Sequence, residues 1–272
     1  MERHKASLHK VPFLSVIVPS YQQEKTIKKD LQRMKKTLDK LTKSYEIIVV
    51  VDGFLDKTFQ QAKSLRSTKI HVFGYLTNKG KGYAVRYGMA KAKGDVIAFL
   101  DSGMDLHPKS MEIMLTIMQA KNADIVIGSK LHPKSKVNYP WQRTVMSWGY
   151  RSLVKTFFGL SIRDTQVGLK VFKRNVLIDV LPRLLVKRYA FDIEMLAVAH
   201  YLGYKNIHEA PVTLTFSSWS SITSKNFWQA ISHMLWDTAA VYYRLRILKY
   251  YDNKSKRKWK YDPELNFRVN LP

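Results

Sequence analysis

Short apolar runs alternate with stretches of helical periodicity through the first half of the chain. The apolar runs predict strands at 13–19, 46–51, 69–75, 96–100 and 124–128. Ile27, Leu31, Met34, Leu38 and Leu41 recur at spacings of four and three, which predicts an amphipathic helix. Further helices are expected at 57–65, 82–92 and 108–121. Uninterrupted apolar strands separated by helices indicate an α/β fold, with a mostly parallel sheet covered on both faces.

The pattern changes after residue 128. A polar loop at 129–139 leads to a helix that contains Arg143, and a strand at 168–172, a helix at 192–202 and a strand at 206–216 follow. The last expected helix, 225–251, is amphipathic, with one apolar side made by Phe227, Ile231, Leu235, Val241, Leu245 and Leu248. Its other flank mixes aromatic and basic residues, which suits a helix at a membrane interface. A docked helix with a solvated basic edge is the alternative.

The chain is long enough for one large α/β domain with small additions. We divide its 272 residues into a basic tail at 1–12, a main domain at 13–216, an amphipathic helical region at 217–251 and a basic tail at 252–272. The main domain has two halves, 13–128 and 129–216. We expect the tail from residue 252 to be poorly ordered. No stretch reaches the roughly 18 uninterrupted apolar residues that a membrane-spanning helix needs.

Charge is the most unusual property of the composition. The chain has 46 Lys and Arg against 21 Asp and Glu, a formal net charge of +25. Such a field favours a polyanionic partner, namely nucleic acid, an anionic membrane or a phosphate-bearing substrate. Nucleic acid is disfavoured, because no zinc-finger, RNP or KH signature accompanies the charge. The basic cluster at 244–260 is interleaved with Tyr and Trp, which favours a membrane surface.

Two features that the sequence lacks narrow the possible site chemistry and the possible location of the protein. The chain has no cysteine, which excludes disulfides, thiolate metal sites and a cysteine nucleophile. Residues 1–11 are polar and basic, without the apolar segment of a secretory signal. We therefore expect a cytoplasmic protein that lies peripherally on a membrane.

Two carboxylates follow the strand at 96–100. Asp101 and Asp105 stand four positions apart at its carboxyl end, where open α/β sheets bind their ligands. Two such carboxylates beside a phosphate ester indicate a divalent cation, Mg²⁺ or Mn²⁺. Gly103 stands between them, at the position where a third carboxylate would complete the set of metal ligands. The alternative role for Asp105 is to cap the helix that begins near Pro108.

Polar residues also follow the first two strands. Tyr21 could stack on a base and Glu24 is an acceptor, while Asp52 could bind a base or a ribose. The alternative for Asp52 is a turn carboxylate that caps the next helix. The run Asn-Lys-Gly-Lys-Gly at 78–82 could offer N–H groups and charge to an anion, or could be an ordinary start of a helix. Neither a dinucleotide-binding G-x-G-x-x-G after the first strand nor a P-loop is present.

Together these segments resemble a known family. The strings VPSYQQEKTI, VVDGFLDKT, NKGKGYAVRYGMAKAKGD, FLDSGMDLHP, DTQVGLKVFKR and FDIEML occur in this order. Over roughly residues 13–215 the chain is similar to family 2 glycosyltransferases with the Rossmann-like GT-A fold. Within that family it looks most like the dolichyl- and polyprenyl-phosphate sugar transferases. The resemblance implies substrate-binding positions at Pro19, Tyr21, Glu24, Asp52, Lys81, Asp101, Ser102, Gly103, Lys130, Asp164 and Gln166.

The resemblance also implies catalytic positions at Asp101, Asp105, Arg143, Asp192 and Glu194, with Asp101 and Asp105 as metal ligands. Lys81 matches a position near the donor's phosphates, and Arg143 matches an arginine that meets the acceptor's phosphate. If the acceptor were a hydroxyl, Asp192 or Glu194 would have to take its proton.

This chain departs from the family pattern in three places. Val51 replaces the first Asp of the usual Asp-Asp-Gly, so base recognition rests on Asp52. Gly103 replaces the second Asp of D-x-D, and Asp105 is expected to restore the lost ligand. The usual Arg-Gly-Ser-like stretch reads Ser-Ser-Trp-Ser-Ser at 217–221.

The expected activity is inverting transfer of a sugar from a nucleotide-diphosphate sugar, of the GDP-mannose or UDP-glucose type, to a polyprenyl or dolichyl phosphate. Two alternatives stay open. One is a family 2 glycosyltransferase that acts on a soluble or polysaccharide acceptor. The other is a non-catalytic nucleotide-sugar binding protein with a degraded metal site.

Overall fold

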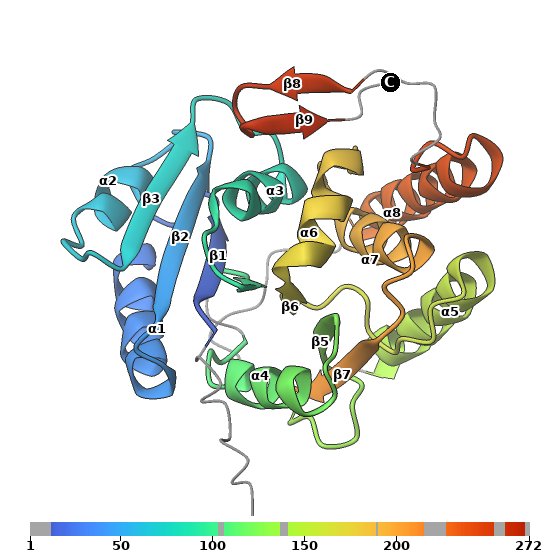
Figure 1. The fold of residues 1–272 in the computed structure, drawn as a ribbon, viewed down its shortest axis with the longest axis horizontal. Coiled ribbons are helices and arrows are strands. Elements are labelled where there is room, and N and C mark those ends of the chain that lie inside the picture. The colour runs from blue at the N-terminus through green and yellow to red at the C-terminus, as the bar shows by residue number, and fades with distance from the viewer. Residues whose placement is uncertain are drawn as a thin grey trace, which may run out of the picture.

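A seven-stranded sheet forms the centre of the computed structural model (Figure 1). The structure describes residues 12–102, 106–136, 141–188, 190–214, 227–252 and 259–269, with the backbone alone at 141–148 and 227–231. The strand order is β3-β2-β1-β4-β6-β5-β7. The strands are β1 (Leu14–Ser20), β2 (Tyr45–Asp52), β3 (Ile70–Tyr75), β4 (Val96–Leu100), β5 (Ile125–Ser129), β6 (Leu169–Lys173) and β7 (Ile207–Pro211). The mostly parallel sheet predicted from the apolar runs is confirmed.

The helices cover both faces because of the order in which the strands are added. The helices are α1 (Ile27–Leu41), α2 (Thr58–Lys63), α3 (Lys81–Lys91), α4 (Ser110–Ala120), α5 (Trp141–Phe158), α6 (Arg174–Val180), α7 (Phe191–Tyr201) and α8 (Phe227–Tyr242). The chain moves outward from β1 to β3 and then returns past β1 to β4. Because such crossovers are right-handed, α1 and α2 lie on one face and α3 on the other (Figure 1). The periodic apolar residues Ile27, Leu31, Met34 and Leu38 are buried, as predicted for α1.

One strand runs against the others. β6 pairs antiparallel with both β4 and β5, whereas β1, β2, β3 and β4 pair in parallel. The start of β6 therefore lies at the same edge as the carboxyl ends of β1, β2 and β4. This reversal brings residues 164–168 to the edge where Asp52 and Asp101 lie.

The C-terminal region differs from the sequence-based expectation. The last helix is shorter than 225–251, since α8 ends at Tyr242 and passes into a π-helical turn, Tyr243–Ile247. Tyr250 and Tyr251 are fully buried, so these two aromatics belong to the core and cannot face a membrane. Among the described residues, no helix has the length and apolar character required to cross a bilayer.

The tail beyond residue 252 was expected to be poorly ordered, and for the part that the structure describes this is wrong. Residues 259–269 form a hairpin of β8 (Lys260–Asp262) and β9 (Phe267–Val269). Figure 1 shows the hairpin beside α3. The side chains of Leu265 and Val269 are buried, and their burial holds the hairpin against the main domain.

Candidate active site

A cavity of about 820 Å³ opens at the carboxyl edge of the sheet. Its lining comes from the ends of β1, β2 and β4, the start of α3, the segment before β6 and the region around the start of α7. The lining residues are Pro19, Ser20, Tyr21, Gln23, Asp52, Asn78, Gly80, Lys81, Ala84, Asp101, Ser102, Gln166, Arg188 and Asp192. We call this cavity the cleft. Its position agrees with the general rule for ligand sites in open α/β sheets.

Asp101 and Lys81 form an ion pair in the cleft. The Lys81 ammonium lies 2.9 Å from Asp101 Oδ2, and both side chains are about two-fifths exposed. Burial lowers the pKa of Lys81, but the charges of Asp101 and Asp192 outweigh this and leave the pKa raised. The ammonium is therefore charged at neutral pH. A half-exposed pair contributes only about 0–1 kcal/mol to stability, so an anionic ligand can compete for Lys81 at little cost.

The other carboxylate oxygen of Asp101 is enclosed by the protein. Oδ1 is buried and has no hydrogen-bond partner among the described residues. A buried carboxylate oxygen without a partner is costly unless a donor or cation reaches it. Oxygen donors of this kind suit Mg²⁺ or Mn²⁺, which complete their coordination with water and substrate phosphate. Asp101 therefore fits the expected cation. Asp105 and Gly103 lie outside the described residues, and within the described ranges no cluster of three or more metal-ligating side chains occurs.

Gly168 sets the position of the Asp101 carboxylate. The Gly168 carbonyl accepts the Asp101 N–H at 2.9 Å. A Cβ added at Gly168 would lie 1.9 Å from Asp101 Oδ2 and 2.3 Å from its carboxyl carbon. Only glycine leaves room for the carboxylate in this orientation.

Replacing Gly168 with Ala is therefore expected to displace the Asp101 carboxylate and to lower turnover by about a hundredfold, the usual cost of moving a reacting group by an ångström. The variant should remain folded, because the added methyl meets a side chain at the wall of the cleft. Turnover and the melting temperature are the measurements. Gly149→Ala is the matched control, since a Cβ there meets nothing within 4 Å. Turnover of Gly168→Ala within threefold of wild type would contradict this role.

A second ion pair lies beneath the cleft. The Lys170 ammonium is fully buried, 2.5 Å from Asp192 Oδ1 and 2.7 Å from the Val167 carbonyl. Burial lowers the pKa of Lys170, and the neighbouring Asp192 counteracts it. The ammonium also lies 5.0 Å from the centre of the Phe99 ring. Asp192 therefore reaches the cleft in a fixed orientation, held from below by Lys170.

The carboxylate of Asp52 binds the backbone that leads into α3. Its oxygens accept the N–H groups of Lys79 at 2.7 Å and Gly80 at 3.0 Å, and the Gly82 N–H donates to the Lys187 carbonyl. These N–H groups are thus used within the protein. The Lys81 ammonium, in contrast, lies in the cleft, where it can meet an anion. Gly80 is required because its φ is +96° and a Cβ would lie 2.6 Å from the Lys187 carbonyl oxygen.

The alternative role proposed for Asp52, capping the next helix, is also corrected. At the start of α2 the carboxylate of Asp56, not Asp52, accepts the Thr58 N–H at 2.9 Å. Asp52 instead fixes a turn that is distant in sequence and still lines the cleft.

The residues at the end of β1 and directly after it separate into two groups. Pro19 and Tyr21 line the cleft, and Tyr21 is 46% exposed, with its ring free to stack. The Pro19 carbonyl accepts a hydrogen bond from the Ser102 hydroxyl at 2.6 Å, which joins the ends of β1 and β4. Glu24 does not line the cleft. Its carboxylate accepts the Lys57 N–H at 3.1 Å, so the structure places it at the start of α2.

The segment before β6 contributes one side chain to the cleft. Gln166 lines it, whereas Asp164 accepts the N–H groups of Lys130 at 3.1 Å and Gln166 at 3.2 Å. Asp164 therefore shapes the loop, and neither it nor Lys130 is part of the lining. The side chain of Arg143, on α5, lies outside the described residues.

Glu194 is placed away from the cleft, which corrects the expectation of a catalytic role. Its carboxylate is fully buried and accepts the N–H groups of Leu185 and Val186 and the hydroxyl of Tyr251. Burial raises the pKa of Glu194, and these hydrogen bonds counteract the shift. Residues 192 and 194 are two positions apart on one helix, so they point to different sides. Asp192 faces the cleft and Glu194 anchors the 185–186 segment.

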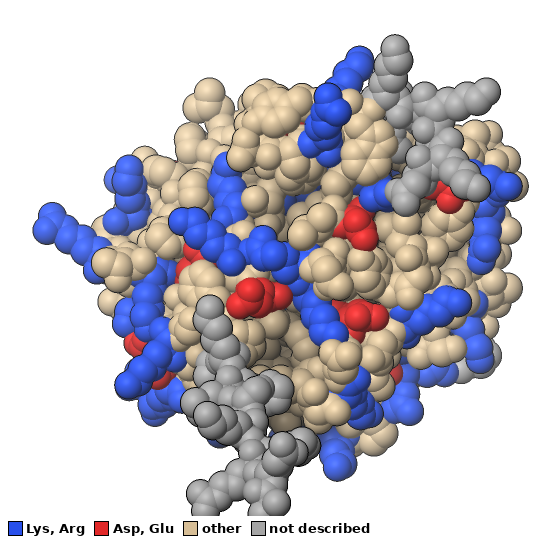
Figure 2. All heavy atoms as spheres, viewed as in Figure 1, with Lys and Arg blue, Asp and Glu red and all other residues tan. Residues whose placement is uncertain are grey.

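Sequence reasoning gave no individual role to Arg188, Asn78 or Lys170, although Asn78 and Lys170 stand in two of the family-like strings. Arg188 lines the cleft and also a second cavity of about 510 Å³, which Asn78, Lys79, Leu185, Val186, Lys187, Asp237 and Arg244 complete. The basic pair 187–188, which ends two residues before the FDIEML string, was the available signal. Figure 2 shows one face of the molecule, with Lys and Arg side chains spread over it and few acidic side chains among them. Such a field attracts an anionic substrate.

The comparisons with known proteins agree with this geometry. The family model described as glycosyl transferase family 2 matches residues 15–181. The chain is 34% identical over 205 residues to a dolichyl-phosphate beta-glucosyltransferase of Drosophila melanogaster, covering 70% of this chain and 63% of that protein. It is 30% identical over 251 residues to the Homo sapiens protein of the same name, covering 86% and 76%.

The fold is also found among solved structures. Glucosyl-3-phosphoglycerate synthase from Mycobacterium tuberculosis, in complex with Mn²⁺, UDP-glucose and phosphoglyceric acid, superposes with a TM-score of 0.66. The match covers 85% of this chain and 80% of that one, at 16% sequence identity. At this identity the likeness shows the fold alone.

Proposed function

Because the chain belongs to glycosyl transferase family 2, we propose that it transfers glucose from UDP-glucose to a polyprenyl or dolichyl phosphate. The observation that carries the proposal is Asp101, whose carboxylate lines the cleft, holds Lys81 through Oδ2 and leaves Oδ1 buried without a partner among the described residues. Glucose and a dolichyl-phosphate acceptor are supported by the names of the fly and human relatives. The uridine base is our proposal; the mycobacterial protein, which shares the fold, binds UDP-glucose.

The donor is proposed to lie across the cleft. Tyr21 would stack on the base, with Asp52 near the ribose and Lys81 facing the diphosphate. Asp101, with Asp105 as its expected partner, would hold Mg²⁺ or Mn²⁺. When bound, the cation neutralises negative charge on the departing diphosphate. Lys81 and Arg188 add fixed positive charge at the same place without reorganisation during the reaction.

The reaction inverts the configuration at the sugar's anomeric carbon. UDP-glucose carries an α linkage, and the relatives are named for a β product. One oxygen of the acceptor phosphate therefore forms the new bond to C1 on the face opposite the diphosphate. The bond from C1 to the UDP oxygen breaks, and UDP leaves with the electron pair. A phosphate acceptor is already an anion at neutral pH, so no general base is required. The buried position of Glu194 agrees with this.

The second cavity is proposed to receive the acceptor's phosphate. Lys187, Arg188 and Arg244 line it, with Asp237 as its acidic member. It shares Asn78 and Arg188 with the cleft, so the two spaces adjoin. It also borders α8 and the turn that follows, the region expected to contact a membrane. A lipid phosphate that enters this second cavity would approach the donor from the membrane side.

Transfer of radiolabelled glucose tests the proposal. Wild-type protein is incubated with Mn²⁺ or Mg²⁺, UDP-glucose or GDP-mannose, and either a short polyprenyl phosphate or phosphoglyceric acid. We expect a glucolipid product with UDP-glucose and the lipid phosphate, and none after chelation of the metal. Product with phosphoglyceric acid alone would instead assign a water-soluble acceptor. Lack of product from every pair would refute the proposal.

The membrane contact is proposed to be peripheral, at the cytoplasmic face, through an exposed apolar strip after the middle of α8. The strip consists of Leu235, Trp236, Tyr243, Ile247 and Leu248, each between 42% and 77% exposed. Arg246 and Lys249 lie exposed beside it, as expected where anionic headgroups meet an apolar surface.

Replacing Ile247 with Ser is expected to weaken binding to vesicles that contain anionic lipid by about tenfold, since burial of such a side chain contributes roughly 1.5–3 kcal/mol. Co-sedimentation with the vesicles measures the effect. Ile178→Ser on α6 is the matched control, because both isoleucines are 62% exposed. Equal binding of the two variants, at the wild-type level, would exclude the strip as a membrane contact.

A further inference from the structure

The C-terminal hairpin has a turn whose geometry is set by its own side chains. Asp262 Oδ1 accepts the N–H groups of Glu264 at 2.9 Å and Leu265 at 3.1 Å, and the Asp262 carbonyl accepts the Asn266 N–H. Asn266 has the left-handed φ of +59° that such a turn requires. These hydrogen bonds close the turn and fix the direction in which the Glu264 carboxylate points.

The hairpin is packed on α3 and on the short 3₁₀ helix Leu181–Arg183. Leu265 is fully buried and Val269 is 1% exposed. The Phe267 ring lies 5.8 Å from the guanidinium of Arg86 on α3, and the Trp259 ring lies 4.9 Å from that of Arg183. These contacts fix where Glu264 stands relative to the start of α3.

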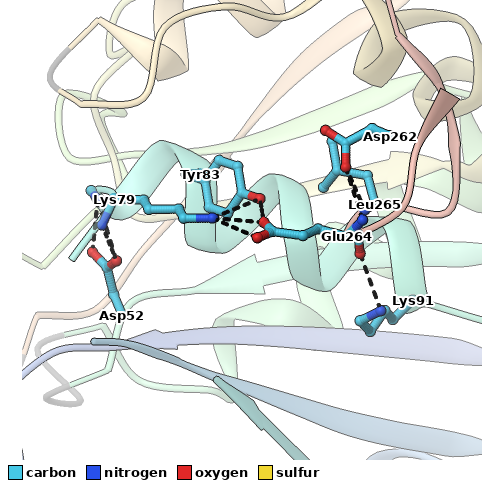
Figure 3. Close-up of polar contacts among 8 residues, drawn as sticks. Asp52, Lys79, Tyr83, Lys91, Asp262, Glu264 and Leu265 are labelled. Atoms are coloured by element: carbon cyan, nitrogen blue, oxygen red, sulfur yellow. Dashed lines mark hydrogen bonds and ion pairs between the residues drawn. The ribbon is translucent and has the colours of Figure 1, made fainter. Parts of the chain in front are cut away.

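Glu264 binds two residues at the start of α3. Its carboxylate accepts hydrogen bonds from the Lys79 ammonium at 2.7 and 2.8 Å and from the Tyr83 hydroxyl (Figure 3). The same ammonium lies 5.2 Å from the centre of the Tyr75 ring and 4.6 Å from that of Tyr83. The hydrogen bonds of Lys79 and Tyr83 lower the pKa of Glu264, which is therefore ionised at neutral pH.

Lys79 joins the hairpin to the cleft. Its backbone N–H donates to Asp52 in the cleft wall, while its side chain extends away from Asp52 to Glu264 (Figure 3). Gly80, the next residue, donates to the same Asp52 carboxylate. Displacement of the Lys79 side chain thus acts directly on the turn that places Asp52 and Lys81.

We propose that the C-terminal hairpin is a positioning element of the cleft, in which Glu264 holds Lys79 and so fixes the 78–80 turn for donor binding. This rests on the proposed function in that the cleft is the donor site. Glu264 is a positioning residue, because it reaches the cleft only through Lys79. Without the charge of Glu264, the Lys79 ammonium and the 78–80 turn are less restricted, and the donor must order them when it binds. The free-energy cost of this ordering lowers the affinity for the donor.

Replacing Glu264 with Gln, which keeps the size but removes the charge, tests the proposal. We expect the KM for the nucleotide sugar to rise about three- to fivefold, with kcat changed by less than about twofold, because a partly exposed ion pair contributes only modestly. Lys79→Met should raise the KM for the donor to the same extent when measured at saturating acceptor, because Lys79 also lines the second cavity. The double variant should then be no worse than either single variant. Glu112→Gln, an exposed change on α4, is the matched control.

Amide hydrogen exchange provides a readout that does not depend on the substrate. Glu264→Gln should speed exchange at Lys79 and Gly80 by about tenfold at an unchanged melting temperature. If wild type transfers no sugar, the proposed function fails, while exchange still decides whether the hairpin controls the turn. Unchanged exchange, or additive effects of the two single variants, would overturn the positioning role.

Discussion

Asp101→Asn is expected to lower sugar transfer by roughly a thousandfold or more, the size of effect seen when a preorganised charge is removed from a reaction centre. The amide cannot replace the unpartnered carboxylate oxygen as a cation ligand, and it weakens the hold on the Lys81 ammonium. The fold should be retained, because the ion pair is half exposed and contributes little to stability. Initial rates at saturating UDP-glucose and Mn²⁺ measure the loss.

Asp39→Asn is the matched control for this substitution. Asp39 also pairs with lysine, at 2.7 Å from Lys35 and 3.1 Å from Lys69, but it lies on α1 outside the cleft. Its variant should transfer sugar at the wild-type rate. Equal activity of the Asp101 and Asp39 variants would mean that the reaction takes place without Asp101.

Lys170→Met is expected to destabilise the folded protein by roughly 3–5 kcal/mol, the usual cost of leaving one member of a buried ion pair without its partner. The Lys170 side chain is fully buried and that of Asp192 is 7% exposed, so water cannot compensate the remaining carboxylate. The Val167 carbonyl also loses its donor. Urea unfolding, followed by intrinsic fluorescence, measures the change in free energy.

The double variant Lys170→Met, Asp192→Asn separates stability from chemistry. Removing both charges should recover much of the lost stability, since the uncompensated charge is gone. Sugar transfer should stay low, because the cleft has then lost Asp192. A single Lys170→Met variant with wild-type stability would show that the pair does not support the cleft.

Much of the main domain could be predicted from the sequence, because its strands are apolar throughout and its helices periodic. The strand at 96–100 has the predicted bounds, and the helix from Ile27 to Leu41 buries four of the five predicted residues, with Leu41 partly buried. The reversal of β6 could not be predicted in the same way. Parallel and antiparallel strands buried on both faces have the same apolar pattern, so only pairing partners decide the direction.

The sequence predicts which strand ends form the site, but it does not predict the hydrogen bonds that the side chains make there. Asp52 and Asp101 meet at one edge as parallel strands require. That Asp52 uses its oxygens on a turn some 27 residues away depends on tertiary contacts that no local pattern encodes. Glu194 is different, because a separation of two residues on a helix already places it on another side from Asp192.

The C-terminal hairpin was missed for a physical reason. Its strands are three residues long and their sequence, KYD and FRV, has no clear alternation of apolar and polar positions. Its stability comes from tertiary burial of Leu265 and Val269 and from the contact of the Phe267 ring with Arg86 on α3. Such an element has no signal of its own in the sequence.

A crystal structure of the protein with UDP-glucose and Mn²⁺ tests the central claim most directly, namely that the cleft binds the donor through Asp101 and Lys81. The account predicts the diphosphate beside the Lys81 ammonium, the cation on Asp101 Oδ1, and the base against Tyr21. A nucleotide bound in the cavity of Lys187 and Arg244, with the Asp101–Lys81 pair intact and no cation on Asp101, would contradict it.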